Sequence, residues 1–348
     1  MNDQYKEAVP PPSARGGASI TLQDVARLAG VTSMTVSRVL NRPELVRSET
    51  RQRVLDAVAQ TGYVPNLLAG ALASNRSRLV ALLLPTIATP IFTEPVQAIM
   101  DTLGASGYQT LLGLTNYSTQ REEQLVETLL GRRPDGIILT GTDHTPLTLK
   151  RLKQANVPIV ELWDLTDDPI DTVVGFSHEE VGAAVARHLI AKGYRRFGVV
   201  SLDDPRGLRR SRSAMRELQQ HGMEMLPMLE LPAPATLQTG RDALVRLLDG
   251  PLPDVLVCST DTLALGILAE AANRGMKLPD DVAVMGFGDL STAAYAHPAL
   301  STVRIDGAAI GQLAARALLA RLDEEQAVSG PAPSRIDTGF TIVDRESA

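Results

Sequence analysis

The sequence predicts a small all-α head joined to a larger α/β body of two doubly wound, parallel-sheet subdomains. The chain has 348 residues, and since a single hydrophobic core stops growing near ~250 residues, more than one domain is expected. Short helical patterns with capping residues occupy residues 19–63, as in a small helical bundle. From residue 79 onward, strand-like apolar runs alternate with helical segments, which is typical of βαβ units.

The first helix of the head is expected to begin after Thr21 and to end at Gly30. Threonine is a good N-cap residue, and Asp24 stands three positions later, where a capping box needs an acid. Glycine is the residue type that most often ends a helix. The apolar residues of this segment share one face: Leu22, Val25, Ala26 and Ala29.

Two further helices complete the head. The second is expected to begin near Thr32 or Ser33 and to end at residues 41–43, where an asparagine, an arginine and a proline follow one another. Ser48 is expected to cap the third helix, which Gly62 stops. Together with the first helix, these segments predict a three-helix bundle.

The body is expected to alternate strands with helices along its whole length. Strand-like apolar runs occupy residues 79–84, 109–114, 136–140, 158–162, 197–201, 254–258 and 282–286. Helices are expected between them, the first two at residues 94–106 and 122–130. Because one doubly wound sheet needs fewer residues than this pattern covers, two stacked α/β subdomains are expected.

These patterns divide the chain into four segments. Residues 1–18, with three consecutive prolines, are expected to form a flexible tail, and residues 19–64 form the head. Residues 65–78 are a stretch of apolar and small residues, too short to be stable as an isolated helix. Residues 79–348 form the body.

Charge is distributed unevenly between these segments. The whole chain carries −6, but residues 19–78 carry +4, because eight arginines oppose four acidic residues. Residues 1–18 are balanced, so −10 remains on residues 79–348. A small basic module on a large acidic body is the pattern of a DNA-binding head with a separate sensing domain. A charged helical surface without a nucleic-acid role could carry the same net charge of +4.

Composition excludes several classes of protein. No run of ~18 apolar residues is present, which argues against a membrane span, and the first residues lack the apolar core of a secretory signal. One cysteine, Cys258, rules out an internal disulfide, and five histidines without HExxH or CxxC spacing argue against a metal site. Glycine-rich phosphate loops and a nucleophile elbow are also lacking. The sequence thus predicts a cytoplasmic protein that is neither an enzyme nor an exported solute-binding protein and that uses no cofactor.

Residues 21–41 fit a helix-turn-helix. Gly30 lets the chain turn tightly between two short helices, and the second helix carries Val36 and Val39 on its inner face. The opposite face carries Ser33, Met34, Ser37 and Arg38. A recognition helix needs this arrangement, because its first residues must reach base edges in the major groove. Any small helical bundle would show a similar pattern.

The segments TLQDVARLAGVTSMTVSRVLN and YVPNLLAGALAS strongly resemble the LacI/GalR family of bacterial repressors. In the body, DGIILTG, GFSHEEVG, CSTDTLALG and DVAVMGFGD are similar to that family's motifs in order and spacing, and the similarity covers residues 20–345. The resemblance implies a periplasmic-binding-protein-like sensing domain in a homodimeric repressor that binds a palindromic operator. The end of the chain, which lacks leucine heptads, favours a dimer over a tetramer.

The resemblance implies roles for residues of the second helix. Ser33 and Met34 occupy the positions at which family members read bases, and Arg38 matches an arginine that reaches the groove, where its forked donors suit guanine. Backbone-phosphate or groove contacts are implied for Thr32, Ser37 and Asn41. Met34 departs from the polar residue often found there, so a thymine methyl group is its expected contact. The alternative is a solvent-facing side chain without a role.

Residues 66–73 are similar to the family's hinge helix, which folds only on cognate DNA. The resemblance implies that Asn66 belongs to this DNA-bound element, that Leu72 inserts into the central minor-groove step, and that Ala69 lets the backbone come close. Such a wedge unstacks bases and kinks the duplex. The alternative is that Leu72 packs on the core. A hinge that orders on DNA supplies a switch, since whatever separates two hinges abolishes tight binding.

In the similar fold, effectors bind between the two subdomains, at the carboxyl ends of strands. The resemblance places these residues at pocket positions: Phe92, Thr140, Trp163, Arg210, Asp261 and Asp289. Three of them have plainer alternatives: Arg210 as a charge on a helix surface, Asp261 as a helix N-cap and Trp163 as a core anchor. His178 is expected to be a capping or structural histidine rather than a ligand.

The sequence departs from the sugar-binding members of the family at two positions. Gly288 replaces an aspartate that reads hydroxyls, and Ser213 replaces a glycine. Losing an acid beside a binding arginine favours an anionic ligand over a neutral sugar. The motifs are most similar to those of gluconate- or ketogluconate-responsive repressors, which implies a sugar acid, with its carboxylate on Arg210 and its hydroxyls on Asp261 and Thr140. A neutral sugar or a protein co-effector is the alternative.

Overall fold

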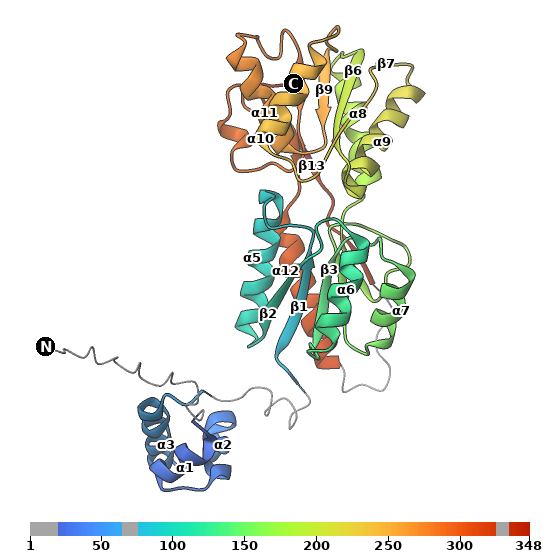
Figure 1. Ribbon diagram of the computed structural model, residues 1–348. Helices are drawn as coiled ribbons and strands as arrows, with labels where there is room; N and C mark the ends of the chain where they lie inside the picture. Colours follow the sequence, from blue (N-terminus) through green and yellow to red (C-terminus); the bar gives the residue numbers. More distant parts are fainter. Residues whose placement is uncertain (1–19, 65–75, 325–333) are drawn as a thin grey trace, which may run out of the picture. The chain divides into compact units, whose positions relative to one another are not determined.

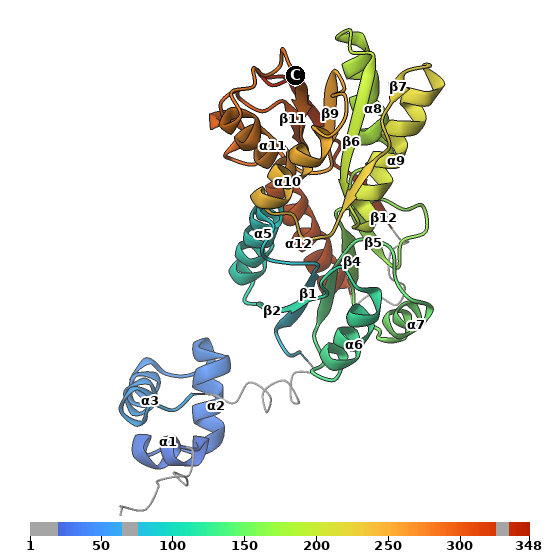
Figure 2. The same ribbon diagram turned by 45° about the horizontal axis from the view of Figure 1, so that its top comes forward.

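A computed structural model of the protein describes residues 20–64, 76–324 and 334–348 (Figure 1, Figure 2). Its contacts divide the chain into two compact units, residues 1–75 and residues 76–348. The first unit contains the head and the second contains the body.

Within the described residues, the head is a bundle of three α-helices and one 3-10 turn. Its elements are α1 (Leu22–Ala29), α2 (Ser33–Asn41), η1 (Pro43–Leu45) and α3 (Ser48–Thr61). Val25, Val36 and Val54, one from each α-helix, are fully buried at its centre. Burial of each aliphatic side chain of this size contributes about 1.5–3 kcal/mol, which stabilises the bundle.

The predicted starts of α1 and α2 are confirmed, and that of α3 is corrected. Thr21 and Asp24 form the expected capping box, in which Asp24 N donates to Thr21 Oγ1 at 3.4 Å and Thr21 N donates to Asp24 Oδ2 at 3.0 Å. Gly30 ends α1 in a left-handed conformation, at φ 65°. Ser48 does not cap α3, because it is the first helical residue and Arg47 holds the N-cap position. The helix begins there because Arg47 O already accepts an intrahelical hydrogen bond, at 2.9 Å.

The first subdomain of the body comprises residues 76–175, 307–324 and 334–337. Its sheet has the strand order β12-β5-β4-β3-β1-β2, and all neighbouring strands are parallel. The strands are β1 (Leu79–Leu84), β2 (Gln109–Leu114), β3 (Gly136–Thr140), β4 (Ile159–Leu162), β5 (Thr172–Gly175) and β12 (Ser334–Asp337). The helical elements are η2 (Pro90–Phe92), α5 (Thr93–Ala105), α6 (Thr119–Leu130), α7 (Pro146–Gln154) and α12 (Gly307–Glu324). Although α12 comes late in the chain, it packs against α5 (Figure 1).

The second subdomain comprises residues 178–304 and 341–348. Its sheet has the order β10-β9-β6-β7, with β8 also paired to β6, and it too is parallel. The strands are β6 (Arg196–Leu202), β7 (Glu224–Met225), β8 (Leu229–Leu231), β9 (Val255–Cys258), β10 (Ala283–Met285) and an antiparallel pair, β11 (Thr302–Arg304) and β13 (Thr341–Val343). The helical elements are α8 (His178–Ala191), α9 (Pro205–Gln220), α10 (Leu237–Leu247), α11 (Asp261–Asn273) and η3 (Ala293–Tyr295).

Both sheets are covered on both faces, as parallel sheets require. Along β1, Leu82 and Leu83 are 0% and 1% exposed, although successive strand residues point to opposite faces. The predicted fold class is confirmed, and β1, β2 and β3 have the predicted bounds. Six short strands were not predicted: β5, β7, β8, β11, β12 and β13. Segments of two to four residues show little periodicity, although the equally short β4, β9 and β10 were predicted from their apolar runs.

The chain crosses between the subdomains at residues 176–177, 305–306 and 338–340. Residues 176–177 continue β5 into α8, and residues 305–306 continue β11 into α12. Because these crossings are short, the carboxyl ends of strands in the first sheet stay close to the start of α9, in the second subdomain (Figure 2). A cleft therefore forms where parallel strands of two sheets end.

Candidate functional site

The exposed face of α2 carries the side chains predicted to contact DNA. Val36 and Val39 are buried, and the side chains of Thr32, Arg38 and Asn41 are exposed. Ser33 and Ser37 are partly exposed on the same side. Met34 is 70% exposed, which is unusual for a large apolar side chain. The helix therefore offers polar groups and one apolar group to a partner.

Some of these side chains already have local hydrogen bonds. Thr32 caps α2 by accepting from Thr35 N at 3.3 Å. Asn41 Nδ2 donates to Ser37 O at 2.9 Å and lies 3.3 Å from Ser37 Oγ. These contacts fix the two ends of the helix and hold Asn41 and Ser37 beside each other. The predicted hinge residues, Asn66, Ala69 and Leu72, lie outside the described residues.

A cavity of about 40 Å³ lies between the two subdomains of the body. We call it the central cavity, and it is lined by Thr89, Ile91, Phe92, Tyr117, Trp163, Leu202, Asp204, Arg206, Arg210, Thr260, Asp261, Thr262, Phe287 and Leu290. Neighbouring hollows share residues with it, among them two that contain predicted effector residues. The side bay, about 50 Å³, shares Tyr117 and Arg206, and the outer groove, about 530 Å³, shares Ile91 and Leu290.

The structure brings together some of the predicted effector residues and separates others. Phe92, Trp163, Arg210 and Asp261 all line the central cavity. Thr140 lines the side bay instead, and Asp289 lines the outer groove.

Arg210 is held in place by contacts on three sides. It is 8% exposed, its Nη1 lies 2.8 Å from His178 Nδ1, and its Nη2 donates to Ser259 O at 2.7 Å. Its Cζ lies 3.7 Å from the centre of the Phe287 ring, a cation–π contact. Burial lowers the pKa of Arg210 to about 10. Arg210 is therefore a buried cation facing the cavity, not a charge on a helix surface.

His178 is a structural residue that positions Arg210. Because a guanidinium only donates, Nδ1 of His178 must accept from Arg210, and Nε2 donates to Trp163 O at 3.0 Å. Burial, together with the charge of Arg210, lowers the pKa of His178 well below its usual value, so the ring is neutral. Ser177, not His178, caps α8.

Aromatic rings form one wall of the central cavity. Trp163 is 3% exposed, and its ring centre lies 5.5 Å from that of Phe92 and 5.6 Å from that of Phe176. Its backbone is left-handed, at φ 71°, a conformation that costs about 1–3 kcal/mol for a bulky residue. Trp163 is thus both a core anchor and a lining residue. Such rings suit the apolar face of a ligand.

Asp261 is buried with both carboxylate oxygens bonded. It is the first residue of α11, and Thr260 is the N-cap, so the alternative of an Asp261 cap is wrong by one position. Thr302 Oγ1 donates to Oδ1 at 2.5 Å, and Leu290 N donates to Oδ2 at 2.7 Å. Burial raises the pKa of Asp261 to about 6, against the effect of these two hydrogen bonds.

Thr140 and Asp289 are engaged elsewhere. Thr140 Oγ1 donates to Leu83 O at 3.0 Å, within the first sheet. Asp289 accepts from Arg304 Nε and from Arg345 Nη2, each at 2.6 Å. A role for either residue toward an effector stays a prediction.

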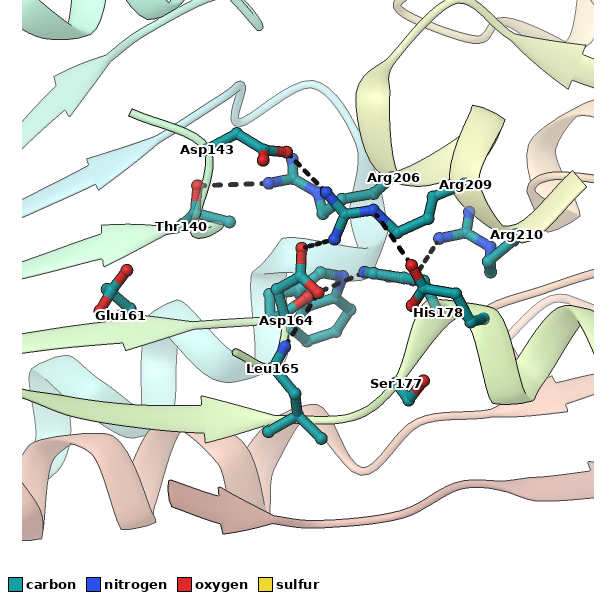
Figure 3. A network of polar contacts seen from close by, with 12 residues as sticks. Thr140, Asp143, Glu161, Asp164, Leu165, Ser177, His178, Arg206, Arg209 and Arg210 are labelled. Carbon is teal, nitrogen blue, oxygen red and sulfur yellow. Dashed lines mark hydrogen bonds and ion pairs between the residues drawn. The ribbon is translucent and has the colours of Figure 1, made fainter. Parts of the chain in front are cut away.

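The start of α9 contributes arginines that the sequence did not single out (Figure 3). Arg206 Nη1 donates to Thr140 O at 3.2 Å. Arg209 forms ion pairs with Asp164 and Asp143 of the first subdomain, each at 2.7 Å, and with Glu179 at 3.6 Å. The contacts with Thr140, Asp164 and Asp143 join the two subdomains across the cleft, whereas Glu179 belongs to the second subdomain. The sequence places four arginines between residues 206 and 212, and this cluster of charge does not indicate which of them faces the cavity.

A buried ionic cluster lies behind the side bay. His144, with its side chain 1% exposed, lies 2.6 Å from Glu122 Oε1 and 3.4 Å from Glu161 Oε1. Burial opposes a charge on His144, but the hydrogen bonds and charges of Glu122 and Glu161 outweigh it and raise the pKa to about 9. His144 is therefore protonated at neutral pH.

Two classes of site are not found within the described ranges. No group of three or more His, Cys, Asp or Glu side chains there is arranged to hold a metal ion. Among the same residues, no helix is both long and apolar enough to cross a membrane.

Two family models match the chain. Residues 21–66 match the model described as bacterial regulatory proteins, lacI family, and residues 186–348 match the model described as periplasmic binding protein-like domain. The first match covers the whole of α1, α2 and α3. The second covers most of the second subdomain.

Individual relatives match over nearly the whole length. The HTH-type transcriptional regulator GntR of Pseudomonas aeruginosa is 38% identical over 94% of this chain and 95% of its own. A LacI-family transcriptional regulator of Silicibacter pomeroyi, of known crystal structure, is 32% identical, with a TM-score of 0.87 over 94% of this chain and 99% of its own. The lac repressor dimer bound to operator and the anti-inducer ONPF is 25% identical, with a TM-score of 0.80 over 95% of this chain and 99% of its own.

Proposed function

The chain belongs to the LacI family of bacterial regulatory proteins and is a DNA-binding transcriptional repressor, and from this premise we infer that it binds a palindromic operator as a homodimer and is released by a small sugar acid. The operator lies on the chromosome, so the protein works in the cytoplasm. Neither a cofactor nor a metal ion is needed for this activity.

In the proposed complex, α2 enters the major groove. Ser33 and Met34 contact base edges, and Arg38 donates to guanine. Phosphate or groove contacts come from Thr32, Ser37 and Asn41. The exposure of these side chains, opposite the buried Val36 and Val39, supports this arrangement.

Residues 66–73 are proposed to act at the centre of the operator. Asn66 belongs to a hinge helix there, Ala69 allows a close approach of its backbone, and Leu72 wedges between base pairs. A separation of the two hinges in the dimer would remove both wedges and weaken binding.

The effector is proposed to bind around the central cavity. Its carboxylate meets Arg210, its hydroxyls meet Asp261 and Thr140, and Phe92 and Trp163 cover its apolar face. Asp289 stands at the rim. The central cavity holds about 40 Å³, well below the ~300 Å³ of typical ligand pockets, so we propose that the subdomains move apart to admit the ligand.

One observation carries the choice of an acid. Arg210 is buried, and no carboxylate in the described part of the chain lies within ion-pair distance of it. The charges of Asp204 and Asp164 act on Arg210 only from beyond ion-pair distance. A buried cation without a directly paired carboxylate is costly, and a carboxylate or phosphate of the ligand would reduce that cost. By linkage, an acid that weakens operator binding must itself bind the DNA-free form more tightly by the same factor.

The test is fluorescence anisotropy on an operator fragment from the promoter of the protein's own gene and of neighbouring transport genes, at one fixed salt concentration. Gluconate, 2-ketogluconate, 6-phosphogluconate and neutral glucose are titrated in turn. Release by an acid but not by glucose is the expected result. Release by glucose would favour a neutral sugar. DNA binding that responds to none of them would exclude the sugar acid and point to a protein co-effector.

A further inference from the structure

Two guanidinium groups of α9 face the same hollow. Arg206 and Arg210 are four residues apart, so their side chains project from the same face of the helix. Both line the central cavity, and Arg206 also lines the side bay. Figure 3 shows Arg206 reaching toward Thr140, across the cleft from its own helix. Arg206 therefore lies where the two hollows join.

The partners of Arg206 differ from those of its neighbour Arg209. Arg209 meets the carboxylates of Asp164, Asp143 and Glu179, whereas no carboxylate of the described residues lies within 4.0 Å of Arg206. The hydrogen bond of Arg206 is to a neutral carbonyl oxygen, Thr140 O. A guanidinium has five N–H donors, so most of those on Arg206 remain for a ligand.

The backbone next to Thr140 leaves room for this guanidinium. Gly141 has a φ of +98°, and a Cβ atom at that position would lie 2.7 Å from Arg206 Nη1. The absence of a side chain on Gly141 thus lets Arg206 rest against the end of β3. The contact directs Arg206 toward the first subdomain and away from the solvent side of α9.

Carboxylates that face the central cavity are already bonded. Asp204 Oδ1 accepts from Gly207 N at 2.9 Å, and Asp261 accepts from Thr302 and from Leu290 N. Neither lies within ion-pair distance of Arg206. Like charges four residues apart destabilise a helix, and here they stand near the positive, N-terminal end of α9. An anion bound between the two guanidinium groups would relieve both repulsions.

We propose that Arg206 is the residue by which this repressor distinguishes a carboxylate effector from a neutral one. The inference rests on the proposed function, in which an acid binds beside Arg210. Arg210 keeps its place whether or not the ligand is charged, because it donates to His178 and Ser259 and stacks on Phe287. Arg206 lacks such anchors, so its contribution depends on a negative charge in the ligand. The carboxylate lies between the two guanidinium groups, as a bridge from the central cavity to the side bay.

The test compares Arg206→Gln with Arg212→Gln in the full-length protein. Arg212 is an exposed residue of the same helix, so the control removes the same charge without touching either hollow. Isothermal titration calorimetry measures binding of gluconate and of sorbitol, which has the same carbon chain with an alcohol in place of the carboxylate. Arg206→Gln should weaken gluconate binding by about 10- to 100-fold and leave sorbitol binding unchanged. The ratio of the affinity for gluconate to the affinity for sorbitol should therefore fall by the same factor. Arg212→Gln should bind as the wild type does.

The outcomes separate this inference from the proposed function. Wild-type protein that binds no sugar acid would overturn both. Wild-type protein that binds gluconate, with Arg206→Gln equally tight, would overturn the role of Arg206 and leave the sugar-acid proposal standing. Circular dichroism establishes that each variant is folded. Should Arg206→Gln fail to fold, Arg206→Met also removes the charge and keeps a long unbranched side chain, and an unchanged gluconate affinity in that variant would count against the proposal.

Discussion

The head and the cleft of the body assemble their functional side chains in different ways. In the head, the side chains proposed to contact bases all come from the nine residues of α2, and one buried face fixes which way they point. In the cleft, Phe92 comes from η2, Trp163 follows β4, and Arg210 and Asp261 come from α9 and α11. A local element thus defines one site, and the topology of two sheets defines the other. Changes in the cleft should therefore act on stability and ligand binding together, while changes on the exposed face of α2 act on DNA alone.

The largest effect should come from the aromatic core behind the cleft. Phe176 is fully buried, with its ring centre 4.7 Å from that of His178 and 5.6 Å from that of Trp163. Phe176→Ala should lower the free energy of unfolding of the body by about 3–5 kcal/mol, because it leaves a cavity in the core. Denaturant unfolding, followed separately for each unit, measures this.

The matched change in the head is Val54→Ala. Val54 is fully buried there, and its truncation should lower the stability of the head by about 1–3 kcal/mol and leave the body unchanged. If Phe176→Ala shifted both transitions by the same amount, the two units would not unfold independently and the comparison would fail.

A second difference between the regions is their response to pH. The described residues of the head have no buried ionisable side chain, whereas the body has His144 between Glu122 and Glu161. The pKa of His144 is raised from 6.5 to about 9. Protonation of a group whose folded pKa is raised stabilises the fold fully below pH 6.5, and this stabilisation is lost as the pH rises through 9.

His144→Gln tests this assignment. The difference in unfolding free energy between wild-type protein and the variant should shrink by ~3 kcal/mol between pH 6.5 and pH values above 9. Urea unfolding at a series of pH values measures it. His221→Gln, at an exposed histidine of the second subdomain, is the control and should follow the wild-type curve. Parallel curves for wild-type protein and His144→Gln would show that the cluster does not bind the proton in the folded state.

On α2, a change should affect DNA without affecting stability. Arg38→Gln should weaken operator binding by about 1–3 kcal/mol and reduce the preference for guanine at one position. Arg51→Gln, at an exposed arginine of α3, removes the same charge from the head. Anisotropy on the operator and on a single-base variant distinguishes the two. If Arg38→Gln and Arg51→Gln both lost the same affinity for the operator and for its single-base variant, Arg38 would contact only phosphate.

The contrast also explains which parts of the molecule were predictable from sequence. The buried and exposed faces of α2 follow from the helical period of Val36 and Val39, and the capping box of α1 follows from Thr21 and Asp24. Both depend on neighbours within four positions. By contrast, nothing in the run of arginines after residue 205 tells which one enters the cleft until the N-cap at residue 204 sets the helical phase.

The positions of Thr140, Asp289 and Arg206 depend instead on contacts between elements that are distant in the sequence. Thr140 and Asp289 were predicted at effector-pocket positions, a role that stays a prediction, and the structure adds that Thr140 is bonded to Leu83 O of the neighbouring strand and Asp289 to two arginines near the antiparallel pair β11–β13. Such contacts join residues far apart in the sequence, so no local pattern reveals them. The position of Arg206 in the cleft escaped prediction for the same reason, since its partner carbonyl lies in the other subdomain.

The smallest predicted effect is on the stability of the head, and it compares Thr21, which caps α1, with Ser48, which caps no helix. Thr21→Ala should lower the stability of the head by ~1 kcal/mol, because it removes the hydrogen bonds of the capping box. Ser48→Ala should change it by less than ~0.5 kcal/mol, since Ser48 is already helical and caps nothing. Thermal unfolding of the head measures both. Equal losses would mean that Ser48 caps α3 in solution and that the helix begins one residue later, as its sequence alone predicts.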